Sequence, residues 1–309
     1  MKNKEFKTIS EQIEILKGKG LVISNVEKTK EILLKENYFF INGYRFLFYR
    51  SKVDRRYVEG ATFDEIYALF SFDRDVRNAM FKSMLIVENN IKSIFSYQLS
   101  KKYGYREKDY LRPKNFSQDP SKIRQVNDLI SKMKRQIRIN SKLHNATLHY
   151  LSNYGYIPLW VLVKVLSFGI VGELYSILKP EDQLSIAEIY NLDIDSLLDY
   201  LSLLSNYRNL CAHEDILYEN KTQRQINDTV YHRLLNIPIT DGEYIYGKDD
   251  IYAVIIILKY MLNKEQFSEL ISKLKAAAVT LDSKLSSISI NKVFDKMGFP
   301  SNWYEIEKL

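Results

Sequence analysis

The chain of 309 residues has little cysteine, proline and glycine, and each shortage excludes a class of structure. The single cysteine, Cys211, cannot form an internal disulfide, which excludes a disulfide-stapled scaffold and suits a reducing compartment. Six prolines and 11 glycines are too few for a loop-rich β sandwich and predict long helices. The N-terminal sequence MKNKEFKTIS lacks the apolar run of a signal peptide, so we expect a cytoplasmic protein.

A membrane-spanning segment is also not expected. The best candidate, residues 157–178 (IPLWVLVKVLSFGIVGELYSIL), is long enough, but Lys164 and Glu173 interrupt it and residues 167–169 indicate a break. Two short buried helices account for this run better than a membrane span. The second apolar run, IYAVIIILKYML from residue 251, is too short to cross a bilayer and predicts a core helix.

The familiar catalytic and metal-binding signatures are missing. The sequence has no glycine-rich phosphate loop, no paired CxxC, no HExxH and no GxSxG. Four scattered histidines and one cysteine argue against a structural zinc site, and no cluster of carboxylates suggests magnesium. We therefore expect neither a metal nor a cofactor.

The charge is positive and unevenly distributed. The net charge of +7 and the isoelectric point of about 9.1 suit an anionic partner, although plain lysine-rich proteins share them. Residues 121–144 form a predicted helix with one acid, Asp128, and a run of basic residues. A solvated helix face is the common explanation of such a run, and contact with an RNA backbone is the competing one. The basic residues are Lys122, Arg124, Lys132, Lys134, Arg135, Arg138 and Lys142.

Apolar residues recur at helical spacing along most of the chain, which predicts an all-α fold. Thr62 and Glu65 match a capping box at the start of a long helix that Gly104 ends. Within that helix, Glu88 is placed one turn before Lys92 and is expected to pair with it.

The chain is expected to divide into three parts. Residues 1–60 form an N-terminal helical segment, with a first helix capped at Ser10 and the aromatic stretch NYFFINGYRFLFY packed on the main body. Residues 61–218 form a helical core. Residues 219–309 begin with an irregular or short-strand excursion and continue as helices.

The most informative segment is the helix that follows Asp193 and Asp195, either of which can cap it. Its apolar stripe, Leu197, Leu201 and Leu204, continues at helical spacing to a charged residue, Arg208. A guanidinium in such a place needs a partner, because burying it unpaired is costly. One alternative is an internal salt bridge, with the nearby His213 at the helix end having no role.

The other alternative is that the helix meets a second copy of itself. Cys211 and Ala212 are small, so two helices could approach closely and place Arg208 in a shared cleft. Arginine offers a fixed fork of donors to phosphate, histidine moves protons near neutral pH, and Asn209 could orient either group. Such a set suffices for metal-independent RNA cleavage, in which the 2′-OH attacks the adjacent phosphorus.

One geometric condition follows from the spacing. Five residues turn the direction of a helix by roughly 140°, so His213 does not sit beside Arg208 on a continuous helix. Either the helix loosens near Cys211, or two chains complete the site.

The motif R-N-x-x-x-H resembles the R-x(4–6)-H motif of HEPN ribonucleases. Ordered blocks from about residue 10 to residue 213 also resemble the Abi-like proteins of the AbiD and AbiF type, which have a HEPN-type helical core. The blocks are SEQIEILKGKGLVISN, ENYFFINGYRFLFY, IYALFSFDRDVRNAMFKSMLIVENNIK, HYLSNY, PLWVLVKVLSFG and YRNLCAH.

The resemblance implies a homodimeric, toxin-like ribonuclease of phage defence, with a HEPN-like core, catalytic Arg208 and His213, and a supporting Asn209. It also allows a structured non-coding RNA as a partner of the basic helix. For His149, in the HYLSNY block, packing or RNA contact is expected, whereas His144 and His232 have no predicted role. One alternative is a non-catalytic RNA-binding or interaction module. Another is a DNA-binding regulator, for which no helix-turn-helix is evident.

Overall fold

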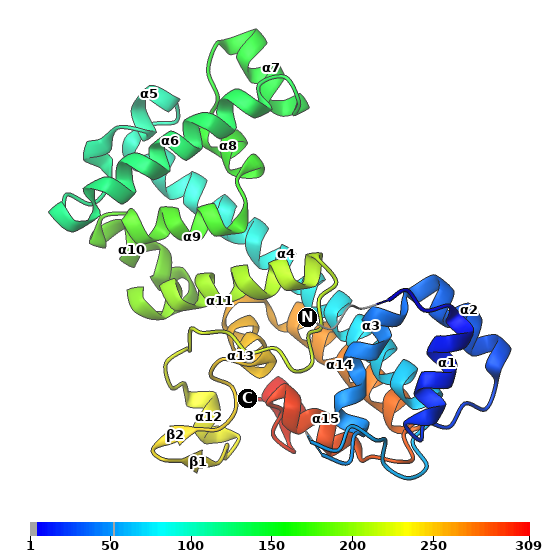
Figure 1. Cartoon of the computed structure of the whole chain (residues 1–309). Helices are drawn as coiled ribbons and strands as arrows, with labels where there is room; N and C mark the ends of the chain where they lie inside the picture. The colour runs from blue at the N-terminus through cyan, green and yellow to red at the C-terminus, as the bar shows by residue number, and fades with distance from the viewer. Residues whose placement is uncertain (1–4, 52) are drawn as a thin grey trace.

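The computed structural model describes residues 5–51 and 53–309, and in this part of the chain the fold is all-α, as predicted (Figure 1). The one sheet in these residues is a two-stranded antiparallel ribbon of β1 (Ile239–Thr240) and β2 (Glu243–Tyr244). It lies in the segment expected to be irregular. The apolar run at 157–178 forms two short helices, α8 (Leu159–Val165) and α9 (Phe168–Ile177). Within the described residues, no helix is long and apolar enough to span a bilayer.

A single long helix, α4 (Phe63–Tyr103), is the axis on which many of the other helices pack (Figure 1). Thr62 and Glu65 form the predicted capping box at its start, and Gly104, with φ +91°, ends it. Helices α8, α11, α13 and α14 all pack against it. Their bounds, with the remaining helices beyond α4, are α5 (Glu107–Tyr110), α6 (Ile123–Asn140), α7 (Asn145–Tyr154), α10 (Pro180–Ala187), α11 (Ile194–Ala212), α12 (Val230–Leu234), α13 (Ile251–Met261), α14 (Lys264–Asp282) and α15 (Ile290–Met297).

The two ends of α4 carry different parts of the chain (Figure 1). Helices α5 to α10 gather around its C-terminal end, and α14 lies along its N-terminal half. The second apolar run forms α13, whose residues 251–258 are nearly inaccessible to solvent, as expected for a core helix. Glu65 joins the start of α4 to the segment after α14, because its carboxylate accepts the backbone N–H groups of Ser286 and Ser287 at 2.7 and 2.6 Å.

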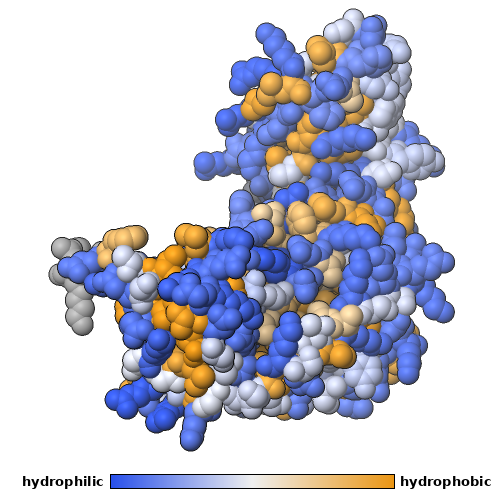
Figure 2. Space-filling view, turned by 90° about the vertical axis from the view of Figure 1, so that its right-hand side faces the viewer, coloured by the Kyte–Doolittle hydropathy of each residue, from blue (hydrophilic) through white to orange (hydrophobic). Residues whose placement is uncertain are grey.

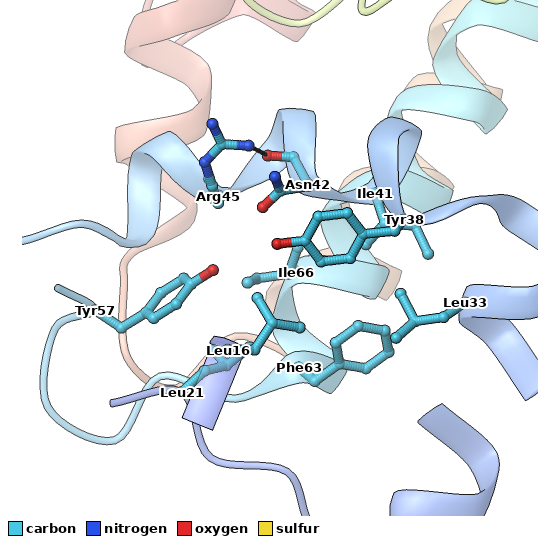
Figure 3. A pocket seen from close by; sticks show the side chains of 10 residues that line it. All are labelled: Leu16, Leu21, Leu33, Tyr38, Ile41, Asn42, Arg45, Tyr57, Phe63 and Ile66. Atoms are coloured by element: carbon cyan, nitrogen blue, oxygen red, sulfur yellow. Dashed lines mark hydrogen bonds between the residues drawn. The ribbon is translucent and has the colours of Figure 1, made fainter. Parts of the chain in front are cut away.

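The N-terminal helices α1 (Ile9–Gly18), α2 (Val26–Glu36) and α3 (Tyr38–Asn42), with the 3-10 helix η1 (Gly43–Phe48), pack on the first turns of α4. Figure 3 shows Leu16, Leu33 and Phe63 converging there. The space left between them is about 10 Å³, so this is a packing contact with room for about one water.

The start of α1 differs from the prediction. Its cap is Thr8, not Ser10, because Glu11 lies three residues after Thr8 and completes a reciprocal capping box. The residue three positions after Ser10 is Ile13, whose side chain cannot accept a hydrogen bond and is buried instead.

A buried carboxylate, Asp73 of α4, connects three segments of the chain. It accepts the hydroxyl of Tyr44 at 2.7 Å, the guanidinium of Arg77 at 2.9 Å, and the backbone N–H groups of Leu217 and Tyr218 at 3.0 and 2.7 Å. Burial raises the pKa of the Asp73 carboxyl, and these four donors oppose that rise by stabilising the charged form. Asp73 thereby fixes the N-terminal segment and the segment after α11 to the central helix.

We expect Asp73→Ala to lower the free energy of unfolding by about 3–5 kcal/mol, because it leaves the buried Arg77 without its charge partner. Asp75→Ala is the matched control, since Asp75 is exposed on the same helix, and it should change stability by less than about 0.5 kcal/mol. Urea denaturation followed by circular dichroism measures both. Equal midpoints for the two variants would contradict the anchoring role of Asp73.

Candidate functional site

Helix α11 positions the motif residues through its buried face. Of the two expected caps, Asp193 is the one that forms, and it accepts the backbone N–H of Ser196 at 2.7 Å. The predicted stripe of three leucines is buried. At the next position of that stripe, the side chain of Arg208 is 28% exposed, so it lies at the boundary between core and solvent.

Arg208 has an internal partner, Glu88 of α4. The Nε of Arg208 donates to Oε2 of Glu88 at 3.1 Å, and Nζ of Lys92 donates to Oε1 of the same carboxylate at 2.7 Å. The guanidinium also lies 5.6 Å from the ring centroid of Phe81, within cation–π range. The predicted Glu88–Lys92 pair is therefore present, and Glu88 serves both cations at once.

This pairing leaves part of the guanidinium unused. Only Nε of Arg208 has an acceptor among the residues that the structure describes, while the two terminal nitrogens have none. Arginine in this arrangement is fixed along one edge and keeps donors on the other. Such an edge can bind two oxygens of one phosphate.

His213 lies at the C-terminal end of α11 with its ring in solvent. Its backbone N–H donates to the carbonyl of Asn209 at 3.1 Å, and its ring makes no hydrogen bond to any residue in the described part of the chain. The side chain of Asn209 is exposed as well. The helix is regular through Ala212, so the predicted alternative in which it loosens near Cys211 is wrong. Arg208 and His213 therefore project from one chain in different directions.

The helix ends in a Schellman turn immediately after His213. The N–H of Asp215 donates to the carbonyl of Leu210 at 3.2 Å, and Glu214 adopts the left-handed conformation with φ +56°. Glycine usually occupies that position, because a side chain is strained there. Asp73 holds the next residues, 217 and 218, so the turn is fixed on both sides.

Cys211 is not available as a nucleophile. It is buried on α11, and burial raises the pKa of its thiol to about 12, which keeps it protonated at neutral pH. Across residues 5–51 and 53–309, no three His, Cys, Asp or Glu side chains are grouped as metal ligands would be.

A groove of about 1090 Å³ lies between the N-terminal segment and the turn after His213. Its walls include Glu214 and Asp215 on one side and the aromatic stretch on the other. Phe39, Phe40 and Phe46 are exposed, so the packing expected for this stretch holds only in part, for side chains such as Tyr44 and Phe48. The short helices α3 and η1 turn the three other rings outward. Figure 2, which faces this end of the molecule, shows hydrophobic residues at the surface among hydrophilic ones.

The basic run of residues 122–142 divides into two groups. Three members have partners: Lys122 donates to a backbone carbonyl of α9 at 3.0 Å, Lys132 pairs with Glu173 at 2.7 Å, and Arg124 lies 3.9 Å from Asp128. The other four are exposed and form no ion pair with any described residue. They are Lys134, Arg135, Arg138 and Lys142.

The remaining histidines have local roles. His144 contacts the hydroxyl of Thr147 at 3.2 Å at the start of α7, and His149 contacts the amide of Asn153 at 3.0 Å on the surface of that helix. His232 is fully buried, and burial lowers the pKa of its imidazole, so it is a neutral packing residue.

Sequence reasoning missed the residues that support the motif. Glu88 was recognised only as the partner of Lys92, and Asp73 was not singled out. Glu88 and Arg208 are 120 residues apart in the sequence, and Asp73 and Leu217 are more than 140 residues apart. The one local signal was the need of Arg208 for a carboxylate.

The match to a family of known proteins covers this whole region. The family model of Abi-like proteins matches residues 31–219, which is more than half of the chain and includes Arg208, Asn209, His213 and the basic helix. Neither the curated proteins nor the solved structures contain a match. The family model links the chain to abortive infection, a bacterial defence against phage. On the length of that match, the chain belongs to the Abi-like protein family.

Proposed function

We propose that the protein is a metal-independent endoribonuclease of the HEPN type that acts in abortive infection as a homodimer. The observation that carries this proposal is the state of Arg208: it is held at Nε by Glu88 and keeps its terminal nitrogens for another ligand. Catalysis at a phosphodiester needs such fixed donors, because they need not reorganise as charge develops.

The charge of the cluster favours an anion. Glu88 carries one negative charge and contacts two cations, Lys92 and Arg208, so the three groups together are positive. Lys92 occupies one oxygen of the carboxylate, which leaves the other for a single bond to Arg208. The arginine is thus oriented without being neutralised.

His213 supplies the proton transfer in this proposal. A histidine titrates near neutral pH and can accept a proton from the ribose 2′-OH. The 2′-oxygen then attacks phosphorus and the bond to the 5′-oxygen breaks. The departing 5′-oxygen takes up a proton from water, and His213 returns its proton to the solvent. The products are a 2′,3′-cyclic phosphate and a 5′-hydroxyl. Arg208 stabilises the negative charge that develops on the phosphate oxygens while these bonds form and break.

The proposed site uses two chains, because the continuous helix α11 turns Arg208 and His213 of one chain apart. A two-fold axis beside the exposed Ala212 would place Arg208 of one chain opposite His213 of the other. The exposed amide of Asn209 would lie in the same cleft and could orient the ribose or the phosphate.

Purified protein should cleave RNA in the presence of EDTA and leave cyclic-phosphate ends. Arg208→Ala and His213→Ala should each lower the rate by about 100-fold or more, because one loses the charge stabilisation and the other the proton transfer. Asn206→Ala, at an exposed position of the same helix, should leave the rate unchanged. Folded Arg208 and His213 variants that cleave as fast as wild type would exclude the assignment and favour a non-catalytic RNA-binding module.

A mixture of the two inactive variants tests the shared site. In a mixed dimer of Arg208→Ala and His213→Ala chains, one site keeps both groups and the other has neither. Random pairing should therefore restore about a quarter of wild-type activity. Differently tagged chains verify that mixed dimers form, and pairing each variant with the double variant is the control. Verified mixed dimers without activity would place the site within one chain.

A further inference from the structure

One stretch of the sequence carries basic residues without any acidic ones. Residues 129–172 contain no Asp or Glu, whereas residues 180–207 contain six acids and no Lys or Arg. This acid-free segment covers the second half of α6, all of α7 and α8, and the start of α9. It carries six positive charges and no negative one. Its cations are Lys132, Lys134, Arg135, Arg138, Lys142 and Lys164.

Four aromatic rings of this segment, together with Tyr105 from the loop after α4, contact one another in a row, the aromatic ladder. Trp160 of α8 lies 5.7 Å from Tyr105, which lies 5.7 Å from Tyr156. Tyr156 then lies 6.2 Å from Tyr154, and Tyr154 lies 5.4 Å from Tyr150 of α7. These are distances between ring centroids. The five rings come from the loop after α4, from α7 with the turn after it, and from α8.

The aromatic ladder is on the surface. Tyr154 is 57% exposed, Trp160 43% and Tyr105 39%, whereas core aromatic residues of this chain are nearly inaccessible. Cations accompany the rings: the guanidinium of Arg106 lies 5.0 Å from the centroid of Tyr156, and the exposed Lys164 follows Trp160 by one helical turn. Exposed ring faces beside positive charges are the usual elements of a single-strand binding platform.

We propose that the aromatic ladder binds unpaired bases of a single-stranded RNA, whose phosphates contact the cations of the acid-free segment. The rings supply stacking faces that any base can use, and Arg106 and Lys164 supply charge next to them. This inference rests on the proposed function for the choice of RNA over DNA. It adds a substrate class: RNA that is single-stranded over several nucleotides.

The position of the aromatic ladder separates binding from cleavage. Tyr105 follows the last residue of α4, Tyr103, and Glu88, the partner of Arg208, lies 15 residues before that end. At 1.5 Å per residue this is about 22 Å along the helix. A strand held on the ladder would therefore have to extend over several nucleotides to reach Arg208.

Other occupants fit the surface less well. A basic protein partner finds no carboxylate in the acid-free segment. An anionic membrane would be served by scattered aromatic and aliphatic side chains and does not require rings that contact one another in a row. The row of ring faces favours stacking partners.

The test measures binding without turnover, in His213→Ala protein. The probe is a fluorescein-labelled oligouridylate of about 12 nucleotides, a length within the site sizes of single-strand binders, and the readout is fluorescence anisotropy. Replacing Trp160 and Tyr154 together by alanine should weaken binding roughly tenfold or more, through lost stacking. Tyr304→Ala is the matched control, because Tyr304 is as exposed as Trp160 but lies near the C-terminus. The same double substitution should weaken binding of a blunt duplex of the same length much less.

The outcomes separate this inference from the proposed function. Unchanged affinity of the Trp160/Tyr154 variant, with a normal melting temperature, would overturn the inference even if wild-type protein cleaves RNA. A loss of affinity would support it even if wild-type protein cleaves nothing. Ladder-dependent binding to phosphatidylserine vesicles but not to the oligouridylate, or conversion of a dimer to a monomer by the double variant, would also overturn it.

Discussion

The ion pair between Glu88 and Arg208 determines how the candidate site is built. It joins α11 to the central helix at a stripe position where local pattern calls for an apolar residue. Hydrophobic residues of similar volume would often serve stability as well or better, by up to about 1–4 kcal/mol, because the carboxylate is desolvated. A pair that stability alone does not require, with donors left on its solvent side, is more readily explained by a ligand than by packing.

The same helix fixes the other end of the site. Asp73 lies 15 residues before Glu88 on α4 and binds the backbone just beyond His213, so α11 and the segment after it are held at two points. Both contacts use buried carboxylates, whose hydrogen bonds are strong in a low dielectric and costly to leave unmade. The strained left-handed Glu214 is tolerated between them. Arg208 and the turn at His213 are thereby positioned by one rigid element.

Local patterns predicted much of the fold and little of the site's support. Helical spacing predicted the all-α class, the two short helices at 157–178 and the Glu88–Lys92 pair, since each depends on residues within a turn or two. The partner of Arg208 could not be predicted, because it is distant in sequence and many carboxylates compete for that role. The aromatic ladder was also not evident, since its rings come from three segments that only the folded chain brings together.

The distribution of charge suggests a division of labour between affinity and chemistry. The groove beside His213 is lined by Glu36, Glu214 and Asp215 as well as by arginines, so it is not a strongly positive trough. The acid-free segment, by contrast, carries six cations and no carboxylate of its own on another part of the molecule. If affinity resides there, the few donors at Arg208 need not hold the substrate in its ground state. They can act instead where they accelerate a reaction, on the charge that develops in the transition state.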